Sequence, residues 1–218
     1  MLDAAQETIQ LLTVVPTTLE ISILSFLLGI VIGTPLAFIR SYEKEIAFLV
    51  DVYEKVFRGI PEIVLMLLFF FGLGPYFQFP FGNAFLTVII VLGLRSGANQ
   101  SQIFRGAIRG VGEEQMVAGR SLGLSRWQTI GRVMIPQVFT FATPGLGSEY
   151  ALLVKDSAYA FVIGILELTQ KAIMINISTY ETQATSFVIA AFLYILLTFP
   201  IATWLDSWGN RRKKKLGM

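Results

Sequence analysis

The chain has 218 residues and a formal net charge of +2, and 54% of its residues are hydrophobic while only 15% are charged. A soluble domain usually carries about 25% charged residues, so this composition is typical of an integral membrane protein. The chain contains no Cys and no His, which excludes disulfides, thiolate chemistry, imidazole metal ligands and histidine proton relays. We therefore expect a single membrane domain over residues 1–218, with no metal site.

Apolar segments without charge mark the expected membrane spans, each of which needs about 20 residues. The first span contains residues 21–39. The uncharged run of residues 63–94 is too long for one crossing, and the Pro- and Gly-rich turn at residues 72–83 divides it into two spans. The fourth span starts near residue 133, and the fifth covers residues 182–205. The sequence thus predicts an all-α integral membrane protein with about five transmembrane helices.

The basic residues cluster in alternate connections between these spans. Most of the 17 Lys and Arg residues fall between spans one and two, between spans three and four, and after span five. Because Lys and Arg concentrate on the cytoplasmic side, we expect the N-terminus outside and the C-terminus in the cytoplasm. The first basic residue is Arg40, so the first span is expected to act as an uncleaved insertion signal. The basic tail, residues 209–218, is expected to anchor this topology, with a lipid-specific or regulatory role as the alternative.

A polar segment interrupts the apolar chain between spans three and four. Glu113 and Glu114 favour the start of a helix, and Gly123 can end that helix in the left-handed conformation. Ser125 and Gln128 have the spacing of a capping box, which predicts a second helix that leads into span four. On the predicted topology, the first short helix lies on the cytoplasmic surface. It is either an amphipathic connector among the lipid headgroups or a docking site for a soluble partner.

The spacing of this segment resembles the EAA loop of ABC importer permeases. Val117-Ala118-Gly119 is followed by Gly123, nine further residues and the run Val133–Pro136. Val117 replaces the Glu of the motif, and Gly119 replaces its second Ala. Further matching elements are Arg58-Gly59 with Pro61, Phe104-Arg105-Gly106, Leu153 to Ser157, and Glu167-Leu168-Thr169. The resemblance extends over about residues 17–203 and points to the polar amino acid uptake subfamily, in its basic amino acid (arginine, histidine or lysine) branch.

This resemblance implies a permease subunit of a type I importer in the bacterial inner membrane, which is not itself an enzyme and holds no cofactor. It implies three partners: a cytoplasmic ATPase dimer that binds ATP and Mg²⁺, a second permease copy (identical or paralogous), and an external solute-binding protein. No nucleic acid partner is expected. The chain contains no P-loop, in agreement with ATP being bound elsewhere.

Within that family the short helix would be the coupling helix that docks on the ATPase. The permease core is expected over residues 17–205 and the coupling loop over residues 106–132. The expected ATPase-coupling residues are Glu113, Glu114, Ala118, Gly119, Arg120, Gly123 and Pro136.

Ionisable residues inside a span are candidate functional residues, because each costs about 2.5–3.5 kcal/mol on insertion scales. Arg95, Asn99 and Gln102 share one helix face in span three. In span four, the Pro and Gly residues of the segment 143–148 are expected to break or kink the helix close to Glu149. The candidate substrate-binding or pathway residues are Glu149, Asn99, Gln102, Ser101, Asp156 and Arg95. The alternative is that these residues pair with one another and have a structural role.

Glu149 has no basic neighbour in the sequence, whereas Asp156 follows Lys155. We expect Glu149, with Asp156, to select the positively charged side chain of a basic amino acid; pairing of Glu149 with Arg95 is the alternative. The function expected is import by alternating access. An ion-coupled secondary amino acid transporter, using Glu149, Asp156 or Glu62, and a membrane scaffold without transport remain as alternatives.

Overall fold

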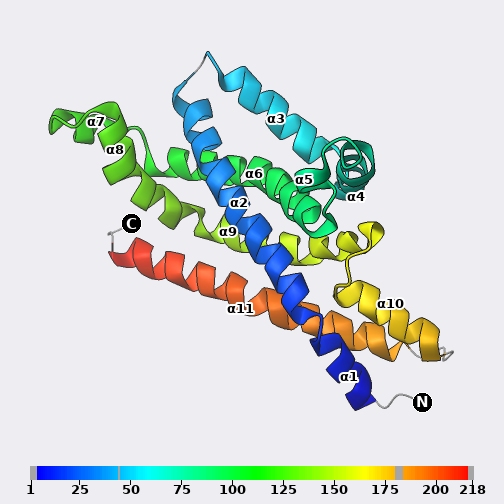
Figure 1. The fold of residues 1–218 in the computed structure, drawn as a ribbon. Helices are drawn as coiled ribbons and strands as arrows, with labels where there is room; N and C mark the ends of the chain where they lie inside the picture. The colour runs from blue at the N-terminus through cyan, green and yellow to red at the C-terminus, as the bar shows by residue number, and fades with distance from the viewer. Residues whose placement is uncertain (1–3, 44, 180–183, 216–218) are drawn as a thin grey trace.

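The computed structural model describes residues 4–43, 45–179 and 184–215, and every regular element in these ranges is a helix (Figure 1). In chain order the elements are α1 (Ala4–Leu12), α2 (Val15–Tyr42), α3 (Ala47–Gly59), α4 (Glu62–Leu67), the π-helix η1 (Leu68–Leu73), α5 (Gln78–Phe81), α6 (Ala84–Val111), α7 (Glu114–Ser121), α8 (Arg126–Thr129), the π-helix η2 (Ile130–Met134), α9 (Ile135–Asp156), the 3-10 helix η3 (Ser157–Ile163), α10 (Leu168–Thr179) and α11 (Thr185–Lys215). The predicted all-α fold is confirmed for these ranges.

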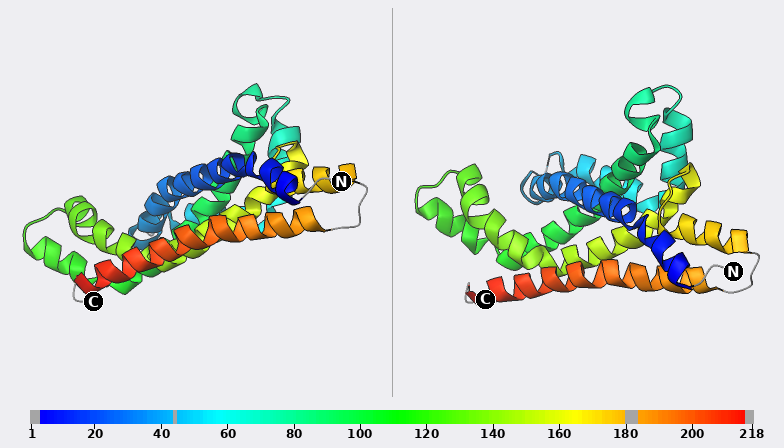
Figure 2. Two further views of the ribbon diagram at one scale, coloured as in Figure 1. Left: turned by 90° about the horizontal axis from the view of Figure 1, so that it is seen from below. Right: turned by 60° about the horizontal axis from the view of Figure 1, so that its bottom comes forward.

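The long helices α2, α6, α9 and α11 form the body of the molecule. Helix α2 packs on α6, and α9 packs on both α6 and α11. In both views of Figure 2, α7, α8 and the C-terminal end of α11 lie at one end of the molecule, while α1 and α10 lie at the other. The polar segment and the basic tail, which the charge pattern assigns to the same side of the membrane, are therefore neighbours at one end of the fold.

Two glycines allow α2 and α6 to approach closely. A Cβ atom on Gly29 would lie 2.5 Å from the Gln100 Nε2 atom, and one on Gly33 would lie 2.8 Å from the carbonyl oxygen of Gly97. Such distances leave no room for a larger residue. Gly29 and Gly33 are four residues apart, a spacing of small residues that commonly allows membrane helices to pack closely. This contact fixes α6 in the centre of the fold, where its polar side chains can reach α3, α4 and α9.

Two of the described helical segments are long and apolar enough to cross a membrane, Ala4–Tyr42 and Thr185–Lys214. A third candidate is the pair Ala47–Gly59 and Glu62–Leu73, if these two helices, bent by 100°, are counted as one span. Helices α6 and α9 have 28 and 22 residues, which is long enough for a crossing, but both carry several charged residues. The five-span count remains a prediction.

Helix α9 is not broken at its Pro and Gly residues, so the break was wrongly predicted, while a kink without a break stays a prediction. The helix runs without interruption from Ile135 to Asp156. Pro144 has no N–H to donate to the carbonyl oxygen of Thr140, but the Thr143 hydroxyl donates to that oxygen at 2.9 Å. Gly145 instead serves packing, because a Cβ atom there would lie 2.6 Å from the Ile103 Cγ2 atom of α6. The irregular helical segments lie at the two ends of α9, in η2 and η3.

The Glu-Leu-Thr element has a structural role at the start of α10. Glu167 is fully buried, and its carboxylate accepts hydrogen bonds from the backbone N–H groups of Thr169 at 2.8 Å and Gln170 at 2.7 Å. The Tyr194 hydroxyl of α11 donates to the same carboxylate at 2.8 Å. This residue therefore caps α10 and holds it against α11.

Candidate functional site

The polar face of α6 makes contacts with α3, α4 and α9 at successive helical turns. We call this set of contacts the polar ladder; its α6 members are Arg95, Asn99, Ser101 and Gln102. With a rise of 1.5 Å per residue, the step from Arg95 to Gln102 corresponds to about 10 Å along the helix axis. The face predicted from the spacing of Arg95, Asn99 and Gln102 thus forms a polar strip inside the fold.

Arg95 forms the first contact of the polar ladder. Its Nε atom lies 2.7 Å from the Glu62 Oε1 atom of α4, and its guanidinium group also pairs with the carboxylate of Asp156 in α9. All three side chains are at most 21% exposed. Asp156 thus forms its ion pair with Arg95, while its sequence neighbour Lys155 is exposed. The same triad gives Glu62 a partner within the chain.

Glu149 forms the second contact, one turn along α6. Its side chain is only 3% exposed, and its Oε2 atom accepts a hydrogen bond from Asn99 Nδ2 at 3.1 Å. The Arg58 Nε atom in turn donates to Asn99 Oδ1 at 3.0 Å. None of the ion pairs among the described residues involves Glu149, because Arg95 is occupied by Glu62 and Asp156. Glu149 is therefore a buried carboxylate that is hydrogen-bonded to an amide but has no direct cationic partner in the described chain.

Glu54 of α3 forms the third contact, and sequence reasoning missed it. The side chain is 3% exposed; it accepts a hydrogen bond from the Ser101 hydroxyl at 2.7 Å and another from the Gln102 amide. Arg40 Nη1 lies 2.7 Å from its Oε2 atom. The available signal was the four-residue spacing from Val50, which is buried on the same face of α3. Glu54 was overlooked because α3 was assigned to a connecting loop between two spans.

The chemistry of the polar ladder follows from its composition. Arg95 and Arg40 each pair with two carboxylates at the two ends, so each of these groups keeps one net negative charge. The central Glu149 accepts hydrogen bonds from the neutral side chains of Asn99 and Ser96, and Arg95 acts on it only at longer range. A buried carboxylate without a counter-charge carries a desolvation cost that a bound cation would relieve. The polar ladder therefore offers one position, at Glu149, where a positively charged ligand group would be stabilised.

The second candidate site is the segment of α7 and α8, which we call the coupling segment (residues 113–129). Gly123 ends α7 with a φ of +82°, as the sequence predicted. The N–H of Leu124 bonds the carbonyl of Gly119 at 3.2 Å, and that of Gly123 bonds the carbonyl of Arg120 at 3.0 Å. These are the two hydrogen bonds of a Schellman motif, so the end of α7 is fixed by its backbone.

The predicted capping box starts the second helix. The N–H of Gln128 donates to Ser125 Oγ at 3.3 Å, and the N–H of Ser125 donates to Gln128 Oε1 at 2.9 Å. Helix α8 continues into η2 and then α9, where Pro136 occupies the first turn. Pro136 cannot donate a backbone hydrogen bond into this continuous helical stretch, and the π-helical turn η2 lies directly before α9. The chain from Ser125 to α9 is thus helical throughout.

Two contacts hold the coupling segment in place. Gly119 is buried against α8, and a Cβ atom there would lie 2.4 Å from the Thr129 Cγ2 atom. Arg126 donates to the Tyr42 carbonyl oxygen at 2.7 Å and pairs with Glu43 at 3.0 Å. The segment is therefore attached to the end of α2 through Arg126.

The outer face of the coupling segment exposes large apolar side chains. The exposed fractions are 64% for Val117, 83% for Leu122 and 67% for Trp127. The predicted coupling residues Glu113, Glu114, Ala118, Arg120 and Gly123 are exposed on the same segment. The three apolar residues were not among the candidate contacts derived from the sequence, although large apolar residues in a polar connection are a signal for a partner. No group of three or more acidic side chains that could hold a metal ion occurs among the described residues.

The chain is similar to known transport proteins over most of its length. Residues 25–215 match the model of the family described as binding-protein-dependent transport system inner membrane component. The chain is 33% identical over 189 residues to the arginine ABC transporter permease protein ArtQ of Haemophilus influenzae, with 83% of both chains covered. It is 32% identical over 197 residues to the glutamine transport system permease protein GlnP of Escherichia coli, with 90% of both chains covered.

A solved structure agrees with these relatives. The fold matches a chain of the crystal structure of an amino acid ABC transporter with histidines, with a TM-score of 0.80 and 29% identity over 97% of this chain and 99% of the other. The relatives are permease subunits and not enzymes, and this chain is likewise a permease subunit. It belongs to the family of binding-protein-dependent transport system inner membrane components.

Proposed function

We propose that this chain is the membrane subunit of an ATP-driven importer of basic amino acids, and that Glu149 binds the cationic side chain of the substrate. The observation that carries this proposal is the environment of Glu149, a carboxylate 3% exposed that accepts hydrogen bonds from the neutral side chains of Asn99 and Ser96. A substrate cation would supply the missing positive charge. The similarity to an arginine permease supports a cationic substrate. Because the chain is also similar to a glutamine permease, the experiment has to test a neutral amino acid as well.

The proposed topology has five spans, with the N-terminus outside and the C-terminus in the cytoplasm of a bacterial cell. It is supported by the distribution of Lys and Arg and by the common position of the coupling segment and the C-terminal end of α11 at one end of the fold (Figure 2). The pathway would be completed by a second permease copy, and an external binding protein would deliver the substrate.

The coupling segment is proposed to dock on a cytoplasmic ATPase dimer, which binds ATP and Mg²⁺. The exposed side chains of Val117, Leu122 and Trp127 provide the apolar contact, and Glu113, Glu114 and Arg120 provide charges around it. Movement of this segment would pass through the continuous helical connection from Ser125 to α9 and so reach Glu149. Alternating access requires such a rigid link between the site of ATP hydrolysis and the substrate site.

The test is uptake by proteoliposomes that contain this chain, its ATPase and its binding protein. We expect ATP-dependent uptake of labelled arginine, and a loss of about tenfold to a hundredfold in the Glu149→Gln variant, because a hydrogen bond or ion pair to a charged group contributes about 1.5–3 kcal/mol. Glu20→Gln is the matched control, since Glu20 is an exposed carboxylate near the N-terminal end of α2, outside the polar ladder. ATP-dependent uptake of neutral glutamine that Glu149→Gln leaves unchanged would contradict the substrate assignment.

A further inference from the structure

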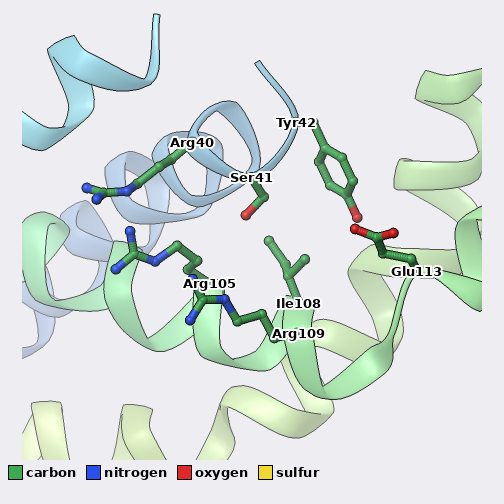
Figure 3. Close-up of a pocket in the computed structure, with 7 residues that line it drawn as sticks. All are labelled: Arg40, Ser41, Tyr42, Arg105, Ile108, Arg109 and Glu113. Carbon is green, nitrogen blue, oxygen red and sulfur yellow. The ribbon is translucent and has the colours of Figure 1, made fainter. Parts of the chain in front are cut away.

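A basic pocket lies where the end of α2 and the end of α6 meet the start of α7. The cavity has a volume of about 410 Å³ and is lined by Arg40, Ser41, Tyr42, Arg105, Ile108, Arg109 and Glu113 (Figure 3). We call it the arginine pocket. Arg40 also contacts Glu54 of the polar ladder, but Arg105 and Arg109 lie beyond the ladder on α6, toward the coupling segment.

The charges in the arginine pocket are separated. Figure 3 shows the guanidinium groups of Arg40, Arg105 and Arg109 on one side of the pocket. On the other side, the Tyr42 hydroxyl points toward the Glu113 carboxylate. The acidic lining residue is therefore directed at a phenol and not at the arginines, so that the positive charges gather on one side of the cavity.

Two of these arginines remain available for a ligand. Arg40 is already paired with Asp51 and Glu54, whereas none of the ion pairs among the described residues includes Arg105 or Arg109. Arg105 donates to the neutral Gln102 side chain, and Arg109 is exposed. The positive charges of Arg40 and Arg109 act unfavourably on that of Arg105. A bound anion would be attracted to all three and would offset this repulsion.

We propose that the arginine pocket binds a phosphate group, either as the headgroup of an anionic lipid or as free phosphate. The planar, multiply donating guanidinium group matches the geometry of phosphate oxygens and remains charged at any physiological pH. On the topology of the proposed function, this end of α6 lies at the cytoplasmic leaflet, where anionic headgroups are concentrated. A bound phosphate would join the ends of α2 and α6 at the root of α7, and so stiffen the attachment of the coupling segment.

The experiment measures binding by the purified 218-residue chain in detergent. Native mass spectrometry reports the retention of phosphatidylglycerol, with diacylglycerol as the lipid that lacks phosphate, and equilibrium dialysis reports the binding of labelled inorganic phosphate. The variants are Arg109→Gln and the pair Arg105→Gln/Arg109→Gln. The matched control is Arg132→Gln, which removes an exposed arginine of η2 outside the pocket.

We expect Arg109→Gln to weaken phosphate or phosphatidylglycerol binding about fivefold, the usual effect of one basic residue at an anionic surface, and the pair to weaken it further. Arg132→Gln should bind as the unchanged chain does. If the variants weaken the binding of phosphatidylglycerol only, the site binds a lipid headgroup. If they weaken the binding of inorganic phosphate only, the site binds a soluble ligand. If binding is equal in the unchanged chain and in folded Arg109→Gln, the proposal is wrong.

This measurement is independent of transport. The pair Arg105→Lys/Arg109→Lys keeps the charge and should retain most of the binding, which separates loss of charge from loss of fold. No ATPase, binding protein or amino acid is present in this measurement. Absence of phosphate binding would therefore not contradict the proposed importer function, and absence of uptake would not contradict phosphate binding in the arginine pocket.

Discussion

The side chains of the polar ladder find their partners inside the chain, whereas most of those of the coupling segment are exposed to solvent. In the polar ladder, buried charged groups such as Arg95 and Glu54 find their partners within the chain. In the coupling segment, the end of α7 and the start of α8 are capped, but large apolar side chains such as Leu122 and Trp127 remain exposed. In the first region the buried charged groups have ion-pair partners except at Glu149. The second region has the properties of a protein-binding surface.

This comparison explains why the two regions should respond differently to mutation. A change in the polar ladder leaves a charge inside the fold without its partner, which reduces the stability of the chain itself. A change on the outer face of the coupling segment removes a contact with a partner and should leave the chain folded. The following substitutions test this difference, from the largest expected effect to the smallest.

Arg95→Leu should have the largest effect, because it leaves the carboxylates of Glu62 and Asp156 together without a cation. Breaking a buried ion pair by removing one partner typically costs about 3–5 kcal/mol. We expect poor membrane expression and a strongly lowered unfolding midpoint of the purified chain. Lys155→Leu is the control, since Lys155 is exposed next to Asp156. Equal destabilisation by both substitutions would mean that Arg95 is not the main partner of Asp156.

Trp127→Ser should weaken the complex with the ATPase and leave the permease folded. The side chain is 67% exposed, so its removal opens no cavity, whereas an interface tryptophan often contributes about 2 kcal/mol or more to binding. Affinity for the ATPase, measured by co-purification or surface plasmon resonance, should fall at least about thirtyfold. Trp204→Ser, on α11 and 63% exposed, should leave this affinity unchanged. A lowered unfolding midpoint for Trp127→Ser would place this residue in the core instead.

Gly119→Ala tests the contact between α7 and α8. The added Cβ atom would lie 2.4 Å from Thr129 Cγ2, and overpacking of this kind costs about 1–3 kcal/mol. We expect α7 to shift away from α8, with a lowered ratio of substrate transported to ATP hydrolysed. Gly106→Ala is the control, because nothing lies within 4 Å of a Cβ atom there. If both variants transport equally well, the packing of α7 on α8 is not needed for coupling.

Gly123→Val should have the smallest effect on stability, of about 1–2 kcal/mol for a side chain in the left-handed conformation. Its functional effect should be specific, since the end of α7 would lose its defined geometry and ATP hydrolysis would no longer drive uptake efficiently. Gly164→Val is a matched control: its φ is +85°, that of Gly123 is +82°, and both positions have open space around a Cβ atom. Equal coupling in both variants would contradict the role of Gly123.

Local patterns predicted the coupling segment accurately. The start of α7, the glycine at its end, and the Ser125–Gln128 capping box all depend on residues within a few positions of one another. Backbone hydrogen bonds and φ values are set at this short range, so the sequence contains the information. The long uncharged segments were likewise visible, although only two of the described helical segments, Ala4–Tyr42 and Thr185–Lys214, meet the criteria for a span by themselves.

The partners within the polar ladder required the tertiary structure. The sequence placed Lys155 next to Asp156 and left Arg95 as a possible partner of Glu149. In the structure, Arg95 reaches Asp156 and Glu62 across two helices, and Asn99 contacts Glu149. A break of α9 was wrongly predicted for a similar reason, because the Thr143 hydroxyl and the packing of Gly145 on α6 compensate for Pro144.

The sequence by itself determined which segments are helical and apolar, which of their residues are polar, and where the helices of the coupling segment end and restart. These properties follow from composition, periodicity and capping, which act over a few residues along the chain. Only the tertiary structure decided which carboxylate meets which cation, that Glu54 is buried, and that three arginines from α2 and α6 share one pocket. Those contacts depend on the distance and rotation between packed helices, and side-chain pairing across that distance leaves no pattern in the linear order of residues.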